Sequence, residues 1–324
     1  MAYDVSGLTN YTKENEDLLV TKSLFTPRTA EIIQKEGNVQ IGIKSSEKIN
    51  ILATDAIFQT GGTCGFNSSG ATSFSQRTLT VGKVKVNESL CPKTLESKYT
   101  QKALQAGSRP DSIPFEEDFS GQKAGTIAEQ IEVAIWQGDT SHGNVNLNKW
   151  DGFLKIIDDG AASVAANATA YISGGAIASA TGITTSNVKS IVNAMWTSLP
   201  ARVMGKEDVA IFCGWDTFNK FIVSYTDANL FAFAPKGSEV SAENGVVIIP
   251  GTNYRLIAVH GLDGTNRLVA SRTSNMYLGT DLQNEEERFE IFFAKEADEV
   301  RFVSEFKYGV QLAFLNEVSH FKLT

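Results

Sequence analysis

The segment from Phe58 to Thr78 constrains the fold of this chain more than any other feature. Its sequence, FQTGGTCGFNSSGATSFSQRT, is rich in glycine, serine and threonine and poor in large apolar residues, so it cannot form a core of its own. Alternating apolar residues typical of strands flank it: Val39, Ile41 and Ile43 before it, and Leu79, Val81, Val84 and Val86 after it. We therefore predict a long β-hairpin within 37–90 that projects from the body and is ordered by contact with a neighbour.

The chain before and after this hairpin has different patterns. Residues 1–36 are polar, are interrupted by Pro27 and show no sustained apolar period, which predicts an extended N-terminal arm. Further along, Ile127, Ile131 and Ile135 recur at helical spacing, and the turn-rich sequence GDTSHGN follows at 138–144. This pattern predicts one long amphipathic helix over about 115–137, within a segment 91–144 that ends at a lobe boundary.

Residues 145–275 alternate between helical and strand patterns. Helical spacing covers 187–204, with Thr184, Thr185 or Ser186 available as an N-cap, and a second helix carries Phe218, Phe221 and Ile222. Strand patterns occur at 209–214, 246–249, 254–259 and 267–271. This alternation predicts an α/β lobe.

The C-terminal segment 276–324 is rich in strand patterns. Its alternating apolar positions are Phe289, Ile291 and Phe293, then Val300 and Phe302, then Val310, Leu312 and Phe314. Gly309 interrupts the last run, which indicates a bulge or a close backbone approach. We expect these strands to complete the first lobe, so the predicted fold class is α+β.

Charge, cysteines and hydropathy exclude several classes. A net charge of -8 argues against a protein that holds nucleic acid through phosphate neutralisation. The three cysteines, Cys64, Cys91 and Cys213, are widely spaced and are expected to be free thiols. No window reaches the ~20 apolar residues of a membrane span, and the N-terminus lacks signal-peptide features. We therefore expect the chain to stay in the cytosol in which it is made.

The motifs of common enzymes are missing from the sequence. It has no GxxxxGK[ST], GxGxxG at a strand-to-helix turn, HExxH or GxSxG, and His142, His260 and His320 lie in separate segments. Acidic clusters occur at 116–118, 158–159 and 285–287, and we interpret them as solvated carboxylates, since none has calcium-loop spacing. We expect no enzymatic activity, cofactor or metal.

The order of these segments resembles the Hong Kong 97 capsid fold of tailed-bacteriophage major capsid proteins. Local sequences are also similar to that family, above all FFAKEADEVRFVSEFKYGVQLAF at 292–314, with LNKWDGFLKII at 147–157 and LTVGKVKVNESLC at 79–91. The resemblance implies an N-terminal arm (1–36), an extended hairpin loop (37–90), a peripheral domain with a spine helix (91–144), an axial domain (145–275) and peripheral closing strands (276–324).

The resemblance also implies a function: self-assembly into the hexamers and pentamers of an icosahedral head shell that encloses double-stranded DNA. Implied partners are further copies of the chain, a portal, decoration proteins and a scaffolding protein, which we expect to be separate because the arm is too short to contain it. DNA would be contacted weakly and nonspecifically, no membrane is involved, and the protein would be assembled in the host cytoplasm and reside in the virion. The alternatives are an encapsulin-like nanocompartment shell and a tail-tube or other virion protein.

Charged residues on the predicted hairpin and ahead of the closing strands are our candidates for subunit contacts. They are Arg77, Lys83, Lys85, Glu285, Glu286, Glu287 and Arg288. The archetype of the family forms a covalent crosslink from a loop lysine, and Lys44, Lys48, Lys83 and Lys85 are candidates for that role by location only. A solvated or ion-paired lysine is the simpler interpretation of each.

Overall fold

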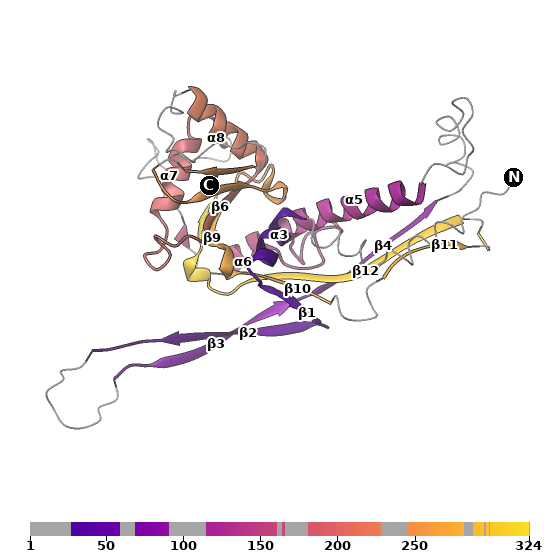
Figure 1. Cartoon of the computed structure of the whole chain (residues 1–324), viewed down its shortest axis with the longest axis horizontal. Coiled ribbons are helices and arrows are strands. Elements are labelled where there is room, and N and C mark those ends of the chain that lie inside the picture. The colour runs from indigo at the N-terminus through magenta and orange to yellow at the C-terminus, as the bar shows by residue number, and fades with distance from the viewer. Residues whose placement is uncertain are drawn as a thin grey trace.

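A computed structural model describes residues 27–58, 69–90, 115–160, 164–165, 181–227, 245–249, 251–281, 288–294, 296–297 and 299–323. Figure 1 shows three parts: a rounded lobe that carries α7 and α8, a long flat sheet with α5 lying along it, and a two-stranded hairpin that extends away from both. Among the described residues no helix combines the length and apolar character that a membrane crossing requires.

The long flat part is a five-stranded sheet built around one strand. Its strands are β1 (Val39–Ile41), β4 (Gly82–Leu90), β10 (Met276–Thr280), β11 (Arg288–Ala294) and β12 (Glu299–Leu312). The 14-residue β12 pairs antiparallel with β10, β11 and β4, and β1 joins as a parallel edge strand on β10. Segments far apart in the sequence therefore meet on β12.

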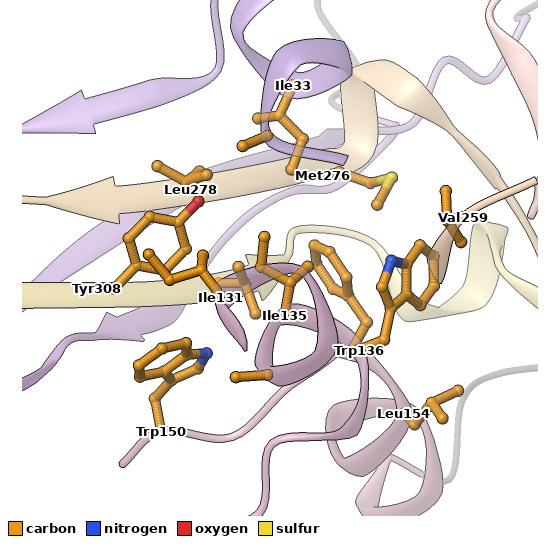
Figure 2. Packing of buried hydrophobic residues seen from close by; sticks show 14 of the residues in the cluster. Ile33, Ile131, Ile135, Trp136, Trp150, Leu154, Val259, Met276, Leu278 and Tyr308 are labelled. Atoms are coloured by element: carbon orange, nitrogen blue, oxygen red, sulfur yellow. The ribbon is translucent and has the colours of Figure 1, made fainter. Parts of the chain in front are cut away.

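Helix α5 (Phe115–Gln137) covers this sheet and has the predicted bounds. The apolar side chains of Ile131 and Ile135 pack toward Leu278 and Tyr308 of the sheet, whereas Trp136 lies beside Val259 (Figure 2). The same core continues through Phe212 and Val259 into the second sheet, so the two sheets share one apolar interior.

The rounded lobe contains a six-stranded sheet in the order β5-β13-β9-β6-β8-β7. Its strands are β5 (Val164–Ala165), β6 (Val209–Cys213), β7 (Val246–Ile248), β8 (Arg255–Ala258), β9 (Leu268–Arg272) and β13 (Ser319–Phe321). Helices α7 (Val188–Thr197) and α8 (Trp215–Asp227) pack against one face, and β6 runs parallel to β8, as expected of an α/β lobe. Helix α7 begins after Asn187 and not at one of the predicted capping residues.

Strand β13 corrects the prediction for 276–324. We expected this whole segment to close the first lobe, but β13 pairs with β9 and β5 in the six-stranded sheet. A three-residue strand carries too little pattern to indicate its partner, and the 3-10 turn η7 (Leu315–Glu317) redirects the chain between the sheets.

The predicted arm is wrong for its last part. Residues Arg28–Lys35 form helix α3, with Ala30 and Ile33 fully buried, whereas 1–26 lie outside the described residues. Pro27 does not merely interrupt the chain but occupies the position before the helix, where its missing N–H group costs nothing.

The remaining short elements are α6 (Phe153–Asp159), η5 (His260–Leu262) and η6 (Thr273–Asn275).

The projecting hairpin consists of β2 (Ser46–Thr54) and β3 (Thr72–Thr80), which pair in register from Ser46 with Thr80 to Thr54 with Thr72. It is narrower than the predicted 37–90, because β1 and β4 at its two ends belong to the five-stranded sheet. The apolar alternation continues through Val81, so the sequence gives no sign that the chain turns between β3 and β4. Residues 59–68 at the hairpin tip lie outside the described part.

Two facing glycines make room for the base of the hairpin. Gly279 on β10 and Gly309 on β12 are register partners, and a Cβ atom at Gly309 would collide with the backbone at Thr80 and Val81. A Cβ atom at Gly279 would press on the side chains of Ile43 and Leu79. The predicted close approach at Gly309 is confirmed.

Gly309→Ala is expected to destabilise the protein by about 1–3 kcal/mol, because the added methyl group meets backbone atoms that cannot rotate away. Chemical denaturation of the variant and the wild type measures the loss. Gly121→Ala on α5 serves as the matched control, because a Cβ atom there has no neighbouring atom within 4 Å. Gly205 is unsuitable as a control, since its positive φ angle would strain an alanine by itself. An unchanged midpoint for Gly309→Ala would contradict the close approach.

Candidate assembly surfaces

The two faces of the β2–β3 hairpin have different environments. On one face, Ile49 and Leu79 are buried near the hairpin base and pack with Ile43, Val81 and Ala313. This small cluster attaches the hairpin to the body. Farther out along the hairpin, no comparable core is found among the described residues.

The other face carries exposed apolar side chains. Leu52 and Phe74 are opposite each other in the register, and they are 56% and 80% exposed. The next rung inward is polar, since Gln76 donates a hydrogen bond to Asn50 across 2.8 Å. Beyond the pair, Ile57 and Phe58 are 56% and 99% exposed. We call Leu52, Ile57, Phe58 and Phe74 the hairpin patch; a patch of this kind on a projecting element is typical of an interaction site.

An apolar groove lies on the body, between α5 and β4. Its volume is about 270 Å³. The apolar residues that line it are Val84, Val86, Ile127, Ile131, Ala134, Val145, Trp150 and Phe306. Val145 is 65% exposed there, and the indole N–H of Trp150 is buried with no hydrogen-bond partner among the described residues. We call this the α5–β4 groove.

Three lysines also line the α5–β4 groove, and two of them are ion-paired within the subunit. Lys85 lies 2.6 Å from Glu305, and Lys123 pairs with Glu88. For Lys149 no ion pair is found within the described residues. Exposed pairs of this kind add little to stability, and the glutamate of each pair offsets the positive charge of its lysine beside the groove.

The predicted contact residues that the structure describes do not form one cluster. Lys85 on β4 and Arg288 on β11 flank Glu305 of β12 from opposite sides, and Lys83 lies opposite Lys307. Arg77 lies on β3 opposite Ile49, where burial lowers its pKa. Residues 285–287 and the side chain of Arg288 lie outside the description. The hairpin patch was not predicted from the sequence. Its signal in the sequence is a pair of large apolar residues in an otherwise polar hairpin.

Two ion pairs, one buried and one partly buried, were also missed. Lys307 of β12 and Asp281, directly after β10, lie 2.6 Å apart, and both side chains are almost completely buried. Asp158 accepts hydrogen bonds from both terminal nitrogens of Arg267, at 2.6 and 2.7 Å, which corrects the prediction that the 158–159 cluster is merely solvated. Its neighbour Asp159 is exposed and pairs with Lys155. These contacts join strands and helices within one subunit.

The histidines and the described cysteine form no catalytic constellation. Cys213 is buried in β6, where burial raises the pKa of its thiol. His260 is exposed and lies 2.8 Å from Asp263, whereas His320 is half-buried and its pKa is lowered by burial. Within the described residues no three His, Cys, Asp or Glu side chains are grouped so that they could hold a metal. Cys64 and Cys91 lie outside the described part.

Solved capsid structures are similar to this fold. A chain of the satellite phage P4 procapsid, a structure that includes the size determination (Sid) protein, has a TM-score of 0.58 and 11% identity over 91% of this chain and 89% of that chain. A chain of the empty GTA particle capsid scores 0.53 at 12% identity, covering 90% and 89%. A chain of the capsid of Myoviridae phage XM1 scores 0.53 at 12% identity, covering 90% and 92%. No protein-family model matches the chain, and no curated protein matches its sequence.

These likenesses show the fold. The chain is a mixed helix and sheet protein whose fold is that of subunits in phage capsid structures, and the similarity spans nearly the whole of each chain.

Proposed function

We propose that this protein is a major capsid protein of a tailed bacteriophage, which assembles with copies of itself into the shell that encloses the genome. The observation that carries the proposal is the capsid fold over 91% of the chain. The hairpin patch and the α5–β4 groove support it, because both are apolar surfaces that the described part of the subunit leaves exposed.

The proposed mechanism is geometric. A hairpin that projects from one subunit reaches a different surface on the next, so the contact is heterologous and closes into rings by rotation. We place the hairpin patch of one subunit against the α5–β4 groove of its neighbour within hexamers and pentamers. The six-stranded lobe would be the axial domain at the centre of each ring, and the five-stranded sheet with α5 would be the peripheral domain.

Charged residues would supply register at these contacts and little of the affinity. The proposed contact residues are Arg77, Lys83, Lys85, Glu285, Glu286, Glu287 and Arg288. The net charge of -8 favours only weak, nonspecific contact with packaged DNA. A separate scaffolding protein, a portal and decoration proteins are the further partners we propose, with assembly in the host cytoplasm and residence in the virion. No enzymatic role is part of the proposal.

Negative-stain microscopy of the protein, expressed alone and together with its genomic neighbours, tests this function. We expect closed icosahedral shells or rings of five and six subunits. A shell that encloses other proteins and forms without a portal would indicate a nanocompartment, and stacked tubes would indicate a tail protein. A persistent monomer in the presence of the neighbours would refute self-assembly.

A further inference from the structure

Helix α3 is attached to the body through an unusual tertiary cap. The residue before the helix is Pro27, and it provides no side-chain hydrogen bond to the free N–H groups of the first turn. Glu132 of α5 takes this role from outside: its carboxylate accepts hydrogen bonds from the Thr29 backbone N–H at 3.0 Å and from the Thr29 hydroxyl at 2.6 Å. The indole N–H of Trp136 then donates to the Thr29 hydroxyl oxygen at 2.8 Å.

The carboxylate of Glu132 is buried. Glu132 is 4% exposed, and within the described residues no lysine, arginine or histidine nitrogen lies within ion-pair distance of its oxygens. Arg28 of α3 and His260 of η5 favour its charge from farther away, and Tyr308 of β12 lies on the sheet side. Taking a carboxylate out of water is costly when its compensation is hydrogen bonds alone. Burial accordingly raises the pKa of Glu132.

Neighbouring residues are packed closely around Glu132. Gly261 of η5 packs so closely on the backbone of Glu132 and the ring of Trp136 that a Cβ atom would not fit there. Trp136 is itself fully buried in the core beside Ile131 and Ile135 (Figure 2). Separation of α3 from α5 is therefore the simplest route by which water reaches this carboxylate, since Thr29 belongs to α3.

We propose that α3 is a pH-sensitive strap, which proton uptake at Glu132 tightens against α5 and proton loss loosens. A protonated carboxyl group still accepts the Thr29 N–H, and its own O–H can donate to the Thr29 hydroxyl, so the contact survives without a buried charge. The inference concerns the single subunit and is independent of the proposed shell.

The sign of the effect follows from the direction of the pKa. A carboxyl group whose folded pKa lies above its ordinary value adds stability below that ordinary value, and this stability is lost as the pH rises through the raised folded pKa. We therefore expect α3 to be held more tightly at about pH 5 than at about pH 7.5. The change in opening is on the order of tenfold for each unit by which the pKa is raised.

Hydrogen exchange of the full-length subunit, followed by mass spectrometry at both pH values and corrected for the intrinsic exchange rate, measures the strap directly. Protection of Arg28–Lys35 should rise on acidification, whereas α7, which contains no carboxylate, serves as the internal reference. Equal protection of α3 at the two pH values, or a loss at acid pH relative to α7, would overturn the proposal.

Variants separate the carboxylate charge from simple packing. Glu132→Gln keeps the shape and removes the charge, so it should protect α3 strongly at both pH values and abolish the pH response. Thr29→Val removes the hydroxyl and should loosen the strap, whereas Thr29→Ser should retain the wild-type pH profile. A pH response in Glu132→Gln equal to that of the wild type would assign the effect to another group. If Glu132→Gln does not fold, the pH dependence of α3 protection in the wild type still tests the proposal.

Discussion

Phe74→Asp is expected to give a folded subunit that forms no closed shell. Phe74 is 80% exposed and belongs to the part of the hairpin that has no core of its own, so the change costs the free subunit little. In an assembly the same position would carry an unpaired charge into an apolar contact. Loss of a buried phenylalanine alone removes about 2–3 kcal/mol, or roughly 30- to 150-fold in the association constant of each contact.

Sedimentation velocity measures whether shells form, and thermal unfolding of the same sample measures whether the subunit is folded. The matched control is Ser73→Asp, which adds the same charge to the adjacent exposed residue on the opposite hairpin face. We expect Ser73→Asp to assemble far better than Phe74→Asp. Shells formed by Phe74→Asp in normal yield would show that the hairpin patch is not an assembly contact.

Asp281→Ala should destabilise the subunit by about 3–5 kcal/mol, because it removes the carboxylate that pairs with the buried Lys307 ammonium. The site lies where β10 ends beside β12, and the Thr280 hydroxyl donates to the carbonyl oxygen of Lys307 in the same place. Loss at this point should loosen the sheet against which the hairpin base packs. Urea denaturation followed by circular dichroism measures the free energy of unfolding.

The double variant Asp281→Asn with Lys307→Met tests whether this site requires charged side chains or tolerates a neutral pair. Because replacement of a buried pair by neutral side chains of similar volume is often close to neutral, this variant should recover most of the stability lost in Asp281→Ala. A loss below about 1 kcal/mol in Asp281→Ala would mean that water reaches Lys307 and that the site is not closed.

Locally repeated patterns allowed much of the fold to be predicted. Helix α5 has the predicted bounds, since Ile127, Ile131 and Ile135 form a continuous stripe. Strands β6, β7, β8 and β9 of the six-stranded sheet lie where short apolar runs stand between turns, and Gly309 marks a close approach as expected. Each of these features depends on residues that are neighbours in the sequence.

Features that depend on distant pairing were not predictable in the same way. Strand β4 pairs with β12, more than two hundred residues away, and nothing in its alternation separates it from β3. The exposed pair Leu52 and Phe74 becomes visible only once the hairpin register is known. The Glu132 cap of α3 and the pair of Lys307 with Asp281 likewise join residues that local sequence does not connect.

A cryo-electron microscopy reconstruction of the assembled particle tests the central claim most directly. We predict an icosahedral shell in which Phe74 of each subunit is buried on a neighbouring copy, at the groove that contains Trp150 and Phe306. Particles without icosahedral symmetry, or a shell in which the hairpin patch faces solvent, would contradict it.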